Sequence, residues 1–316
     1  MILGSHVSTA GGLPKACQRG KNVGCDCIQI FVTPPRRWPV FDSIPRGARE
    51  DELKLVRPLT KNTNRWAGKP LTDEAIESWQ TALADSGLTH PIAHASYLIN
   101  MATPKDDLFA KSIDALVDEM ERGNALGLEG LVVHPGAYTD SSEADGINRI
   151  IDAVAETLGR VDLGSCRLLL ENTAGQGSCL GFTLDQLAQM LDGIADDARV
   201  GVCLDTCHAF AAGYEINTTD GFSEMRKEID DLLPSDCIAA VHLNDSKKPL
   251  GSRVDRHEHI GRGEIGLDGF RNLFADPLLG SLPGYLETEK GTDDASGEDW
   301  DVVNLRVLRD LVGQAT

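Results

Sequence analysis

The chain has 316 residues, of which 41% are apolar and 25% are charged, a composition typical of water-soluble globular proteins. No apolar run is long enough to cross a membrane, and the first residues lack the features of a secretory signal, so we expect a cytosolic (cytoplasmic) protein without a membrane partner. The formal net charge of −19 on its own argues against a nucleic-acid ligand, because phosphate binding favours a basic surface.

Short apolar runs alternate along the chain with longer segments of helical pattern. Strands are predicted at residues 2–6, 27–31, 91–94, 131–134, 167–171, 200–205, 238–244 and 284–287. Thr103, which a proline follows, and Thr183, three residues before Gln186, are predicted helix starts, while Gly87 and Gly127 are predicted helix ends. Strands that alternate with helices indicate a parallel sheet, and eight such units indicate a closed α/β barrel, the (β/α)8 or TIM barrel.

An open, doubly wound sheet is the alternative fold for this pattern. That fold usually carries a glycine-rich, phosphate-binding turn after its first strand. Gly11 and Gly12 follow the first predicted strand, but the sequence contains no G-x-G-x-x-G motif at this place. We therefore favour the TIM barrel over the doubly wound sheet.

Residues 32–59 interrupt the alternation of strands and helices. They contain five prolines, and six Lys or Arg against four Asp or Glu, so the segment is mildly basic within a very acidic chain. Such a composition is typical of a loop that is partly disordered. We interpret it as a loop insertion within a single catalytic domain of residues 1–316.

The eight cysteines predict reduced thiols rather than disulfides. Cys27 and Cys203, for example, lie in apolar, strand-like runs, and buried thiols are usual in a cytosolic chain. Metal binding by Cys25 with Cys27, or by Cys203 with Cys207, is an alternative that their spacing leaves open.

Six of the predicted strands carry, at or close to their C-terminal end, a side chain that can bind a metal ion. These side chains are His94, His134, Glu171, Asp205, His242 and Glu287. In a TIM barrel the C-terminal ends of the strands meet at one rim, where active sites lie, so the six should share a pocket. Burying several carboxylates together is costly without a cation. We therefore predict a metal site at the C-terminal rim rather than six unrelated polar residues.

Three further residues join this set by their local spacing. His208 lies three residues after Asp205, on the same side of a helical turn. Asp255 and His257 are two residues apart, so their side chains point the same way on an extended segment. Nine candidate ligands are too many for one tetrahedral ion and suit about three ions. Histidine and carboxylate together are typical of zinc, manganese or ferrous iron sites.

Seven segments of the sequence resemble the signature segments of the endonuclease IV family, in the same order and with similar spacing. They are HASYLIN (94–100), VVHPGAY (132–138), LLENTAGQG (169–177), GVCLDTCHAFAAGY (201–214), VHLNDSK (241–247), GSRVDRHEHIGRGEIG (251–266) and LETE (286–289). The resemblance extends over most of the chain. It implies a TIM barrel with a trinuclear zinc centre that acts on double-stranded DNA containing abasic sites, and a monomeric protein.

The resemblance also implies a role for each of the nine candidate ligands. Glu171 would bridge two ions and act as the catalytic residue. The other ligands would be His94 and His134 at the first ion, Asp205, His242 and Glu287 at the second, and His208, Asp255 and His257 at a third, more exposed ion. Three Zn²⁺ ions per chain are implied, with Mn²⁺ as an alternative at one or more sites. Bound divalent ions would also reverse the local sign of this acidic chain.

The activity that the resemblance implies is that of an AP endonuclease, or deoxyribonuclease IV. Such an enzyme hydrolyses the phosphodiester 5′ to an abasic site during base excision repair. The products are a 3′-hydroxyl and a 5′-deoxyribose phosphate. Clustered metal ions suit this reaction, because they provide hydroxide near neutral pH and neutralise the charge on the phosphate.

Residues for DNA recognition are implied separately from the metal ligands. Tyr97 and Leu98 match a pair that enters the DNA stack near the lesion. Asn62 and Arg65 lie in TKNTNRW (60–66), which resembles a DNA-contacting loop of the family, although TPPRRW (33–38) competes for this role. The remaining candidates, as phosphate contacts, are Lys247 and Arg256. The basic residues of the 32–59 insertion would add DNA contacts, but we favour the alternative of a tolerated loop without a role.

A metal-dependent sugar isomerase or epimerase on a related barrel is the main alternative function. Such an enzyme also places histidines and carboxylates at the strand ends, but it needs neither three ions nor an exposed Tyr-Leu pair. A metal-binding or DNA-binding module without turnover is a third interpretation.

Overall fold

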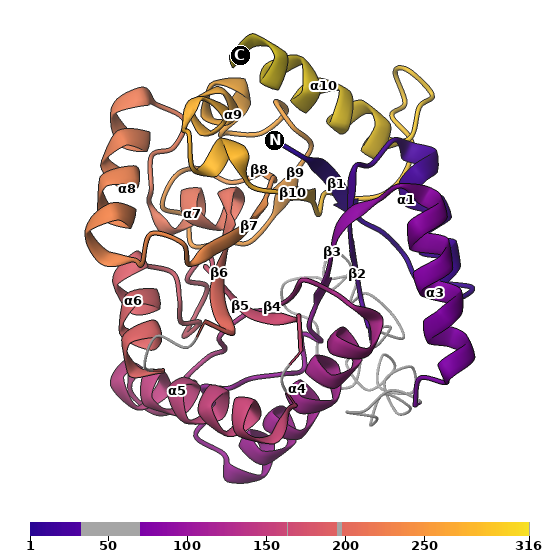
Figure 1. Ribbon diagram of the computed structural model, residues 1–316. Coiled ribbons are helices and arrows are strands. Elements are labelled where there is room, and N and C mark those ends of the chain that lie inside the picture. The colour runs from indigo at the N-terminus through magenta and orange to yellow at the C-terminus, as the bar shows by residue number, and fades with distance from the viewer. Residues whose placement is uncertain (33–69, 163, 195–197, 316) are drawn as a thin grey trace, which may run out of the picture.

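The computed structural model describes residues 1–32, 70–162, 164–194 and 198–315. Its centre is a closed barrel of eight parallel strands in the order β1-β10-β7-β6-β5-β4-β3-β2, which confirms the predicted TIM barrel (Figure 1). The barrel strands are β1 (Leu3–His6), β2 (Cys27–Ile30), β3 (Thr89–His94), β4 (Gly130–Val133), β5 (Arg167–Glu171), β6 (Val200–Asp205), β7 (Ile238–His242) and β10 (Gly284–Leu286). All eight predicted strands are confirmed, with ends that differ by at most two residues.

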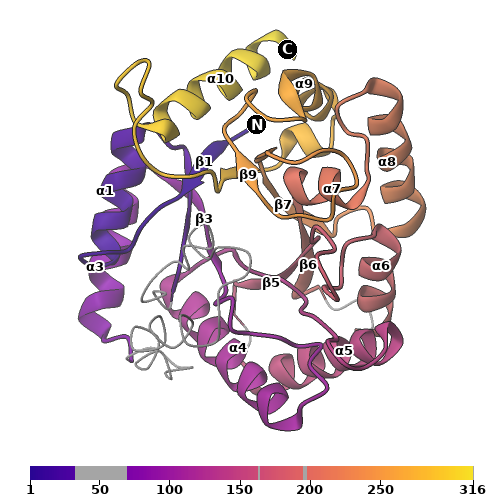
Figure 2. The same cartoon turned by 180° about the vertical axis from the view of Figure 1, so that it is seen from behind.

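Helices surround the barrel on its outside, as both views show (Figures 1 and 2). They are α1 (Leu13–Val23), α3 (Asp73–Ser86), α4 (Asp106–Leu126), α5 (Glu143–Arg160), α6 (Leu184–Gly193), α7 (Thr206–Ala212), α8 (Thr219–Leu232), α9 (Gly266–Ala275), the 3-10 helix η3 (Leu279–Ser281) and α10 (Trp300–Ala315). Among the helices of the described residues, none combines the length and apolar character that crossing a membrane requires.

The helix ends follow the sequence signals at three of the predicted positions. The Thr183 hydroxyl caps α6 by accepting a hydrogen bond from the backbone N–H of Gln186 at 3.2 Å. Gly87 and Gly127 end α3 and α4 in the left-handed conformation, with φ angles of 75° and 69°. Glycine adopts this conformation without the steric cost of a Cβ atom, which explains why both helices stop there.

Two details of these signals are wrong. Helix α4 begins at Asp106 and not after Thr103, because the Thr103 hydroxyl accepts from the Lys105 N–H at 3.3 Å and holds a turn before the helix. The spacing of Thr183 and Gln186 also predicts a capping box, in which the Gln186 side chain accepts from the Thr183 N–H, but the described residues do not show this bond. The side-chain oxygen of Gln186 accepts instead from two backbone N–H groups of the preceding loop, at 2.8 and 3.2 Å.

A small antiparallel ribbon outside the barrel was not predicted. Its strands are β8 (Asp245–Ser246) and β9 (His257–Glu258), and the predicted strand 238–244 ends earlier, at His242. Two-residue strands carry no periodic pattern, so the sequence gives no signal for them. The ribbon matters for the site, because it ties the segment that contains Asp255 and His257 to the end of β7.

An apolar layer fills the barrel interior one step below the C-terminal rim. Its side chains are Cys27, Ile92, Val132, Leu169, Cys203, Ala240 and Tyr285. Successive side chains of a strand point to opposite faces, so the residue two positions further along also points inward. On six of the strands that next position is a predicted metal ligand, and on β2 it is Gln29. The barrel thus places a polar layer directly above an apolar one.

Candidate metal centre

The structure brings all nine predicted ligands together at the C-terminal rim. Within the described residues, four groups of side chains have ligand atoms within 4.8 Å of one another. They are His94/His134/Glu171, Glu171/Asp205/His242/Glu287, His208/Asp255/His257 and Asp205/Cys207/His257. The first three groups have the membership that the resemblance implied. The fourth overlaps with them and adds the buried thiol of Cys207, whereas Cys25, Cys27 and Cys203 join no group.

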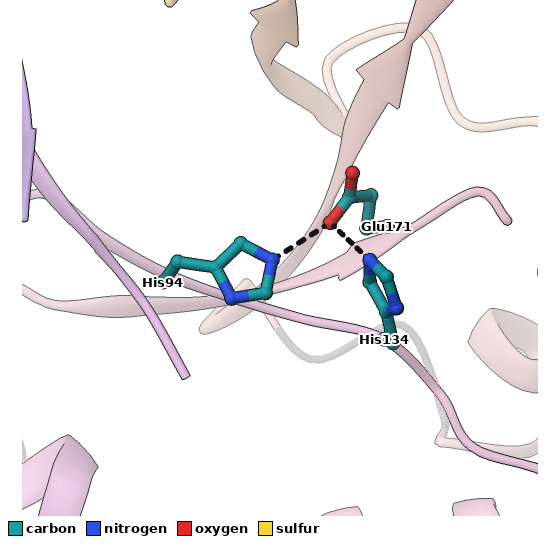
Figure 3. A group of neighbouring side chains, drawn as sticks. All are labelled: His94, His134 and Glu171. Carbon is teal, nitrogen blue, oxygen red and sulfur yellow. Dashed lines mark hydrogen bonds and ion pairs between the residues drawn. The ribbon is translucent and has the colours of Figure 1, made fainter. Parts of the chain in front are cut away.

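Glu171 lies between two of these groups and is completely buried. Its Oε2 atom is 3.1 Å from Nε2 of both His94 and His134 (Figure 3). Its Oε1 atom faces the other side and lies 2.9 Å from Nδ1 of His242 and 3.3 Å from Nδ1 of His208. Each carboxylate oxygen therefore lies next to a different set of imidazoles, which is the arrangement that a bridging ligand needs.

Four carboxylates concentrate negative charge in this cluster. In the described part of the chain, the ion pairs of Glu171, Asp205, Asp255 and Glu287 all run to histidine rings and none to Lys or Arg. Burial alone would raise the pKa of Glu171, but the His242 ring and its neighbours hold that pKa well below its usual range. Imidazoles compensate such charge only when protonated, so a divalent cation fits the cluster better.

The histidines are oriented so that one ring nitrogen is left for a cation. The Nδ1 atoms of His94, His208 and His257 lie 2.8, 2.9 and 3.3 Å from backbone carbonyl oxygens. Because a carbonyl only accepts hydrogen bonds, each Nδ1 carries the ring proton and each Nε2 presents its lone pair. Metal-binding histidines are usually held in this way.

Two of these Nε2 atoms make no hydrogen bond among the described residues although they are buried. They belong to His208 and His257, and each lies 3.3 Å from an oxygen of Asp255. Two lone pairs that face one carboxylate without a proton between them form a donor set that suits a divalent ion.

Two buried asparagines that sequence reasoning missed hold Asp205 in place. Asn244 donates from Nδ2 to Oδ2 of Asp205 at 2.6 Å and accepts from the Glu287 N–H at 2.8 Å. Asn172 accepts from the Asp205 N–H at 2.6 Å. Both follow a strand end closely, and this position is the signal that could have identified them.

Asp245 was also missed, and it organises the segment after His257. Its buried carboxylate accepts hydrogen bonds from the backbone N–H groups of Gly261, Gly263 and Ile265 at 2.9 to 3.0 Å, and from that of Ser246 at 2.8 Å. One carboxylate thus fixes the turn between β9 and α9. The glycines of the IGRGEIG stretch are the sequence signal for such a backbone nest.

The segment between β8 and β9 is docked onto helix α7, which carries His208. The backbone N–H groups of Gly251 and Arg253 donate to Phe210 and Ala211 at 3.1 and 2.9 Å, near the C-terminal end of α7. Arg253 has a positive φ of 52°, and its guanidinium lies 4.5 Å from the centre of the Phe182 ring. These contacts set the distance between His208 and the pair Asp255 and His257.

The predicted DNA-recognition residues occupy different surroundings. Tyr97 is 58% exposed in the loop after β3, whereas Leu98 is half-buried. Lys247 is exposed and pairs with Glu289 at 3.5 Å, and Arg256 is half-buried beside Asp255. The remaining predictions, at Asn62, Arg65, residues 33–38 and nearly all of the 32–59 insertion, lie outside the described residues.

Side chains of helix α4 hold the backbone of the loop that exposes Tyr97. The buried carboxyl of Glu119 accepts from the Ser96 N–H at 3.2 Å, and the Ser112 hydroxyl accepts from the Asn100 N–H at 3.1 Å. Asn100 in turn accepts from the Ala137 N–H at 2.9 Å, in the loop after β4. Tyr97 is thus presented by a loop whose backbone is held at several points.

Known proteins resemble this chain over its whole length. The family model described as a xylose isomerase-like TIM barrel matches residues 17–301. A probable endonuclease 4 of Geobacter sulfurreducens is 43% identical over 318 residues, which cover 99% of this chain and 95% of that protein. A probable endonuclease 4 of Citrifermentans bemidjiense is 42% identical, with 98% and 99% of the two chains covered.

Solved structures give the same result. The crystal structure of endonuclease IV from Thermus thermophilus matches with a TM-score of 0.78 and 31% identity, covering 99% of this chain and 100% of that chain. A D-tagatose 3-epimerase-like protein matches with a TM-score of 0.65 but only 16% identity, which shows a common fold alone. From the full-length identity to the endonuclease 4 proteins, we conclude that this chain belongs to the endonuclease IV family.

Proposed function

We propose that the protein is a metal-dependent AP endonuclease that hydrolyses the phosphodiester 5′ to abasic sites in double-stranded DNA. The products would be a 3′-hydroxyl and a 5′-deoxyribose phosphate, as in base excision repair. One observation carries the proposal: three groups of histidines and carboxylates meet around Glu171 at the barrel rim. Membership of the endonuclease IV family supports it.

Three Zn²⁺ ions per chain are the cofactors that we propose, with Mn²⁺ as an alternative at one or more sites. His94 and His134 would hold the first ion with Glu171, and Asp205, His242 and Glu287 would hold the second with the same carboxylate. A third ion would be held by His208, Asp255 and His257. When bound, clustered divalent ions supply a hydroxide nucleophile near neutral pH and stabilise negative charge on the phosphate.

The side chains and backbone around the site hold the proposed ligands and Tyr97 in fixed orientations. The barrel strands hold Glu171 so that each of its oxygens faces a separate set of imidazoles. Backbone carbonyls fix the ring protons of His94, His208 and His257, so these rings keep their orientation when DNA arrives. Tyr97 stands exposed on a loop that Glu119 and its neighbours hold. We propose that Tyr97, with Leu98, inserts into the DNA beside the lesion.

The acidity of the chain is compatible with a DNA substrate under this proposal. The four carboxylates of the site would be neutralised by the ions, so the rim becomes locally less negative than the net charge of −19 indicates. Lys247 and Arg256 are the described residues that we propose as phosphate contacts. We further propose that the enzyme works as a cytoplasmic monomer.

The sugar isomerase or epimerase interpretation has no specific observation in its favour. Its support is the common fold, at 16% identity or less in the epimerase structures compared. A third ligand group and an exposed tyrosine in the loop after β3 have no use in the isomerisation of a small sugar. We therefore retain this function only as the alternative outcome of the experiment below.

A nicking assay decides between the two functions. The zinc-loaded protein is incubated with a duplex that carries one tetrahydrofuran abasic analogue, with an undamaged duplex of the same sequence as the control. We expect a single cut 5′ to the analogue and a 3′-hydroxyl that a polymerase extends without further processing. An intact abasic duplex, together with epimerisation of a ketohexose by the same preparation, would overturn the proposal.

A further inference from the structure

A glutamine lies among the histidines and carboxylates of the polar layer. Gln29, in strand β2, is completely buried. Its Oε1 atom lies 2.8 Å from Nε2 of His242. Its Nε2 atom lies 2.5 Å from Oε1 of Glu287 and 3.0 Å from Nδ1 of His6. One amide therefore contacts two of the proposed ligands of the second ion, with opposite ends.

The chemistry of these contacts fixes the orientation of the amide. A carboxylate that binds a cation carries no proton, so Glu287 would only accept hydrogen bonds, and the NH₂ group of Gln29 is the group that lies against its Oε1 atom. The NH₂ end of Gln29 must therefore face Glu287, which leaves the oxygen end for His242. That oxygen also only accepts, so the proton of the His242 ring lies on Nε2. Nδ1 of His242 then presents its lone pair toward Glu171, 2.9 Å away.

At the other oriented histidines, a backbone carbonyl rather than a side chain determines which ring nitrogen carries the proton. His94, His208 and His257 each have one nitrogen fixed by a backbone carbonyl, which no substitution removes. His242 instead depends on a side chain, and it presents Nδ1 where the other three present Nε2. Among these four histidines, His242 is therefore the one whose ring is oriented by a side chain, and that side chain is not itself a proposed ligand.

We propose that Gln29 is a positioning residue for the second ion site. Its oxygen keeps the His242 proton on Nε2, so that Nδ1 is available to the ion, and its NH₂ group turns Glu287 toward the same ion. Gln29 is completely buried, so it would act through His242 and Glu287 rather than by contacting DNA. The inference rests on the metal centre proposed above, but it concerns the affinity of one site rather than the cleavage reaction.

Zinc affinity of the full-length protein tests this role. Gln29→Met keeps the length of the side chain and removes both polar ends. We expect one of the three zinc equivalents to bind about ten- to hundredfold more weakly, as is usual when the partner of a ligand is lost, while the other two change little. A competition titration with a chromogenic chelator measures all three affinities. Wild-type affinity for all three equivalents in Gln29→Met would overturn the inference and leave the metal centre standing.

Gln186→Met is the matched control. Gln186 is an equally buried glutamine, but its oxygen accepts from backbone N–H groups in the loop before α6 and touches no proposed ligand. We expect this variant to unfold at a lower temperature with unchanged zinc affinities. Weakening of the same zinc equivalent by both variants would show a general loss of stability and would contradict a specific role for Gln29.

A second measurement does not depend on how the variants fold. Nitrogen-15 NMR of the histidine rings in the zinc-loaded wild-type protein reports which nitrogen carries the proton. We expect His242 to be protonated on Nε2 and to bind zinc through Nδ1. Protonation on Nδ1 overturns the inference even if zinc is bound. A wild-type protein that binds no zinc would overturn both the inference and the metal centre.

Discussion

The two halves of the candidate metal centre are built in different ways. Six of the nine ligands occupy one layer of the barrel, at or just after the ends of strands, so the register of the sheet sets their positions. The other three come from helix α7 and from the segment before and within β9. This second group depends on loop contacts, namely the β8–β9 ribbon, the Asp245 nest and the docking of Arg253 on α7.

Burial follows this division only in part. The side chains of Glu171 and His242 are fully buried and those of Asp255 and His257 are 41% and 18% exposed, but His134 of the barrel layer is 44% exposed and His208 of the outer group only 2%. A site within a sheet layer opens only when the barrel itself opens, but a loop site opens with local motion. We therefore expect two tightly held ions and one that exchanges more readily.

Glu171→Gln should have the largest effect, because it removes the one side chain common to both ion sites of the layer. The amide cannot offer two anionic oxygens, so the stabilisation of several kcal/mol that bound ions give to the phosphate is lost. The rate of nicking should fall by about a thousandfold or more. Nicking of the abasic duplex at the wild-type rate would remove Glu171 from the mechanism.

Asp255→Asn should weaken zinc binding in the outer half of the centre and leave the inner half unchanged. Loss of this carboxylate leaves the Nε2 atoms of His208 and His257 without their common partner, and the third zinc equivalent should bind about a hundredfold more weakly. The two equivalents of the barrel layer should be unaffected. Chelator competition measures this, and equal weakening of all three equivalents would show that the halves are not independent.

Asp245→Asn should have a smaller effect on the same half. In the wild type, several backbone N–H groups donate to the Asp245 carboxylate. In the variant, the NH₂ group of the asparagine would face some of these donors, so the turn after β9 should loosen. We expect the free energy of unfolding to fall by about 2 kcal/mol. The third zinc equivalent should weaken about tenfold. Denaturant unfolding and chelator competition report the two effects, and an unchanged third equivalent would limit Asp245 to stability.

Tyr97→Ala should have the smallest effect of the four variants. It should leave the stability and zinc content of the protein unchanged and weaken only its binding to DNA. The side chain is largely exposed, so zinc content and thermal stability should stay as in the wild type. Stacking of an aromatic ring on a base contributes about 1–3 kcal/mol, so affinity for the abasic duplex should fall about tenfold. Equal affinity of variant and wild type in a fluorescence anisotropy titration would restrict Tyr97 to packing of the loop.

The sequence carried enough information to predict the barrel and the inner half of the site. Alternating side chains place metal-capable residues two positions above an apolar layer, and this period of two is visible without a structure. Asp205 and Glu171, for example, follow Cys203 and Leu169 at that spacing. Gln29 follows Cys27 at the same spacing, but its amide is not a typical metal ligand and was overlooked for that reason.

The outer half could be predicted only as a set of residues and not as a structure. His208 follows from its spacing after Asp205, but the ribbon of two-residue strands that places His257 has no periodic signal. The Asp245 nest likewise depends on backbone N–H groups from residues 261–266, whose convergence is a tertiary property. The recognition residues Asn62 and Arg65 stay predictions, because they lie outside the described residues.

Anomalous diffraction from crystals of the zinc-loaded protein, recorded on both sides of the zinc absorption edge, tests the central claim most directly. It locates each ion and identifies the element in one measurement. We predict three zinc peaks, one in each group of ligands, with Glu171 beside two of them and the weakest peak beside Asp255. A single peak, or peaks away from Glu171, would contradict a trinuclear centre built on this carboxylate.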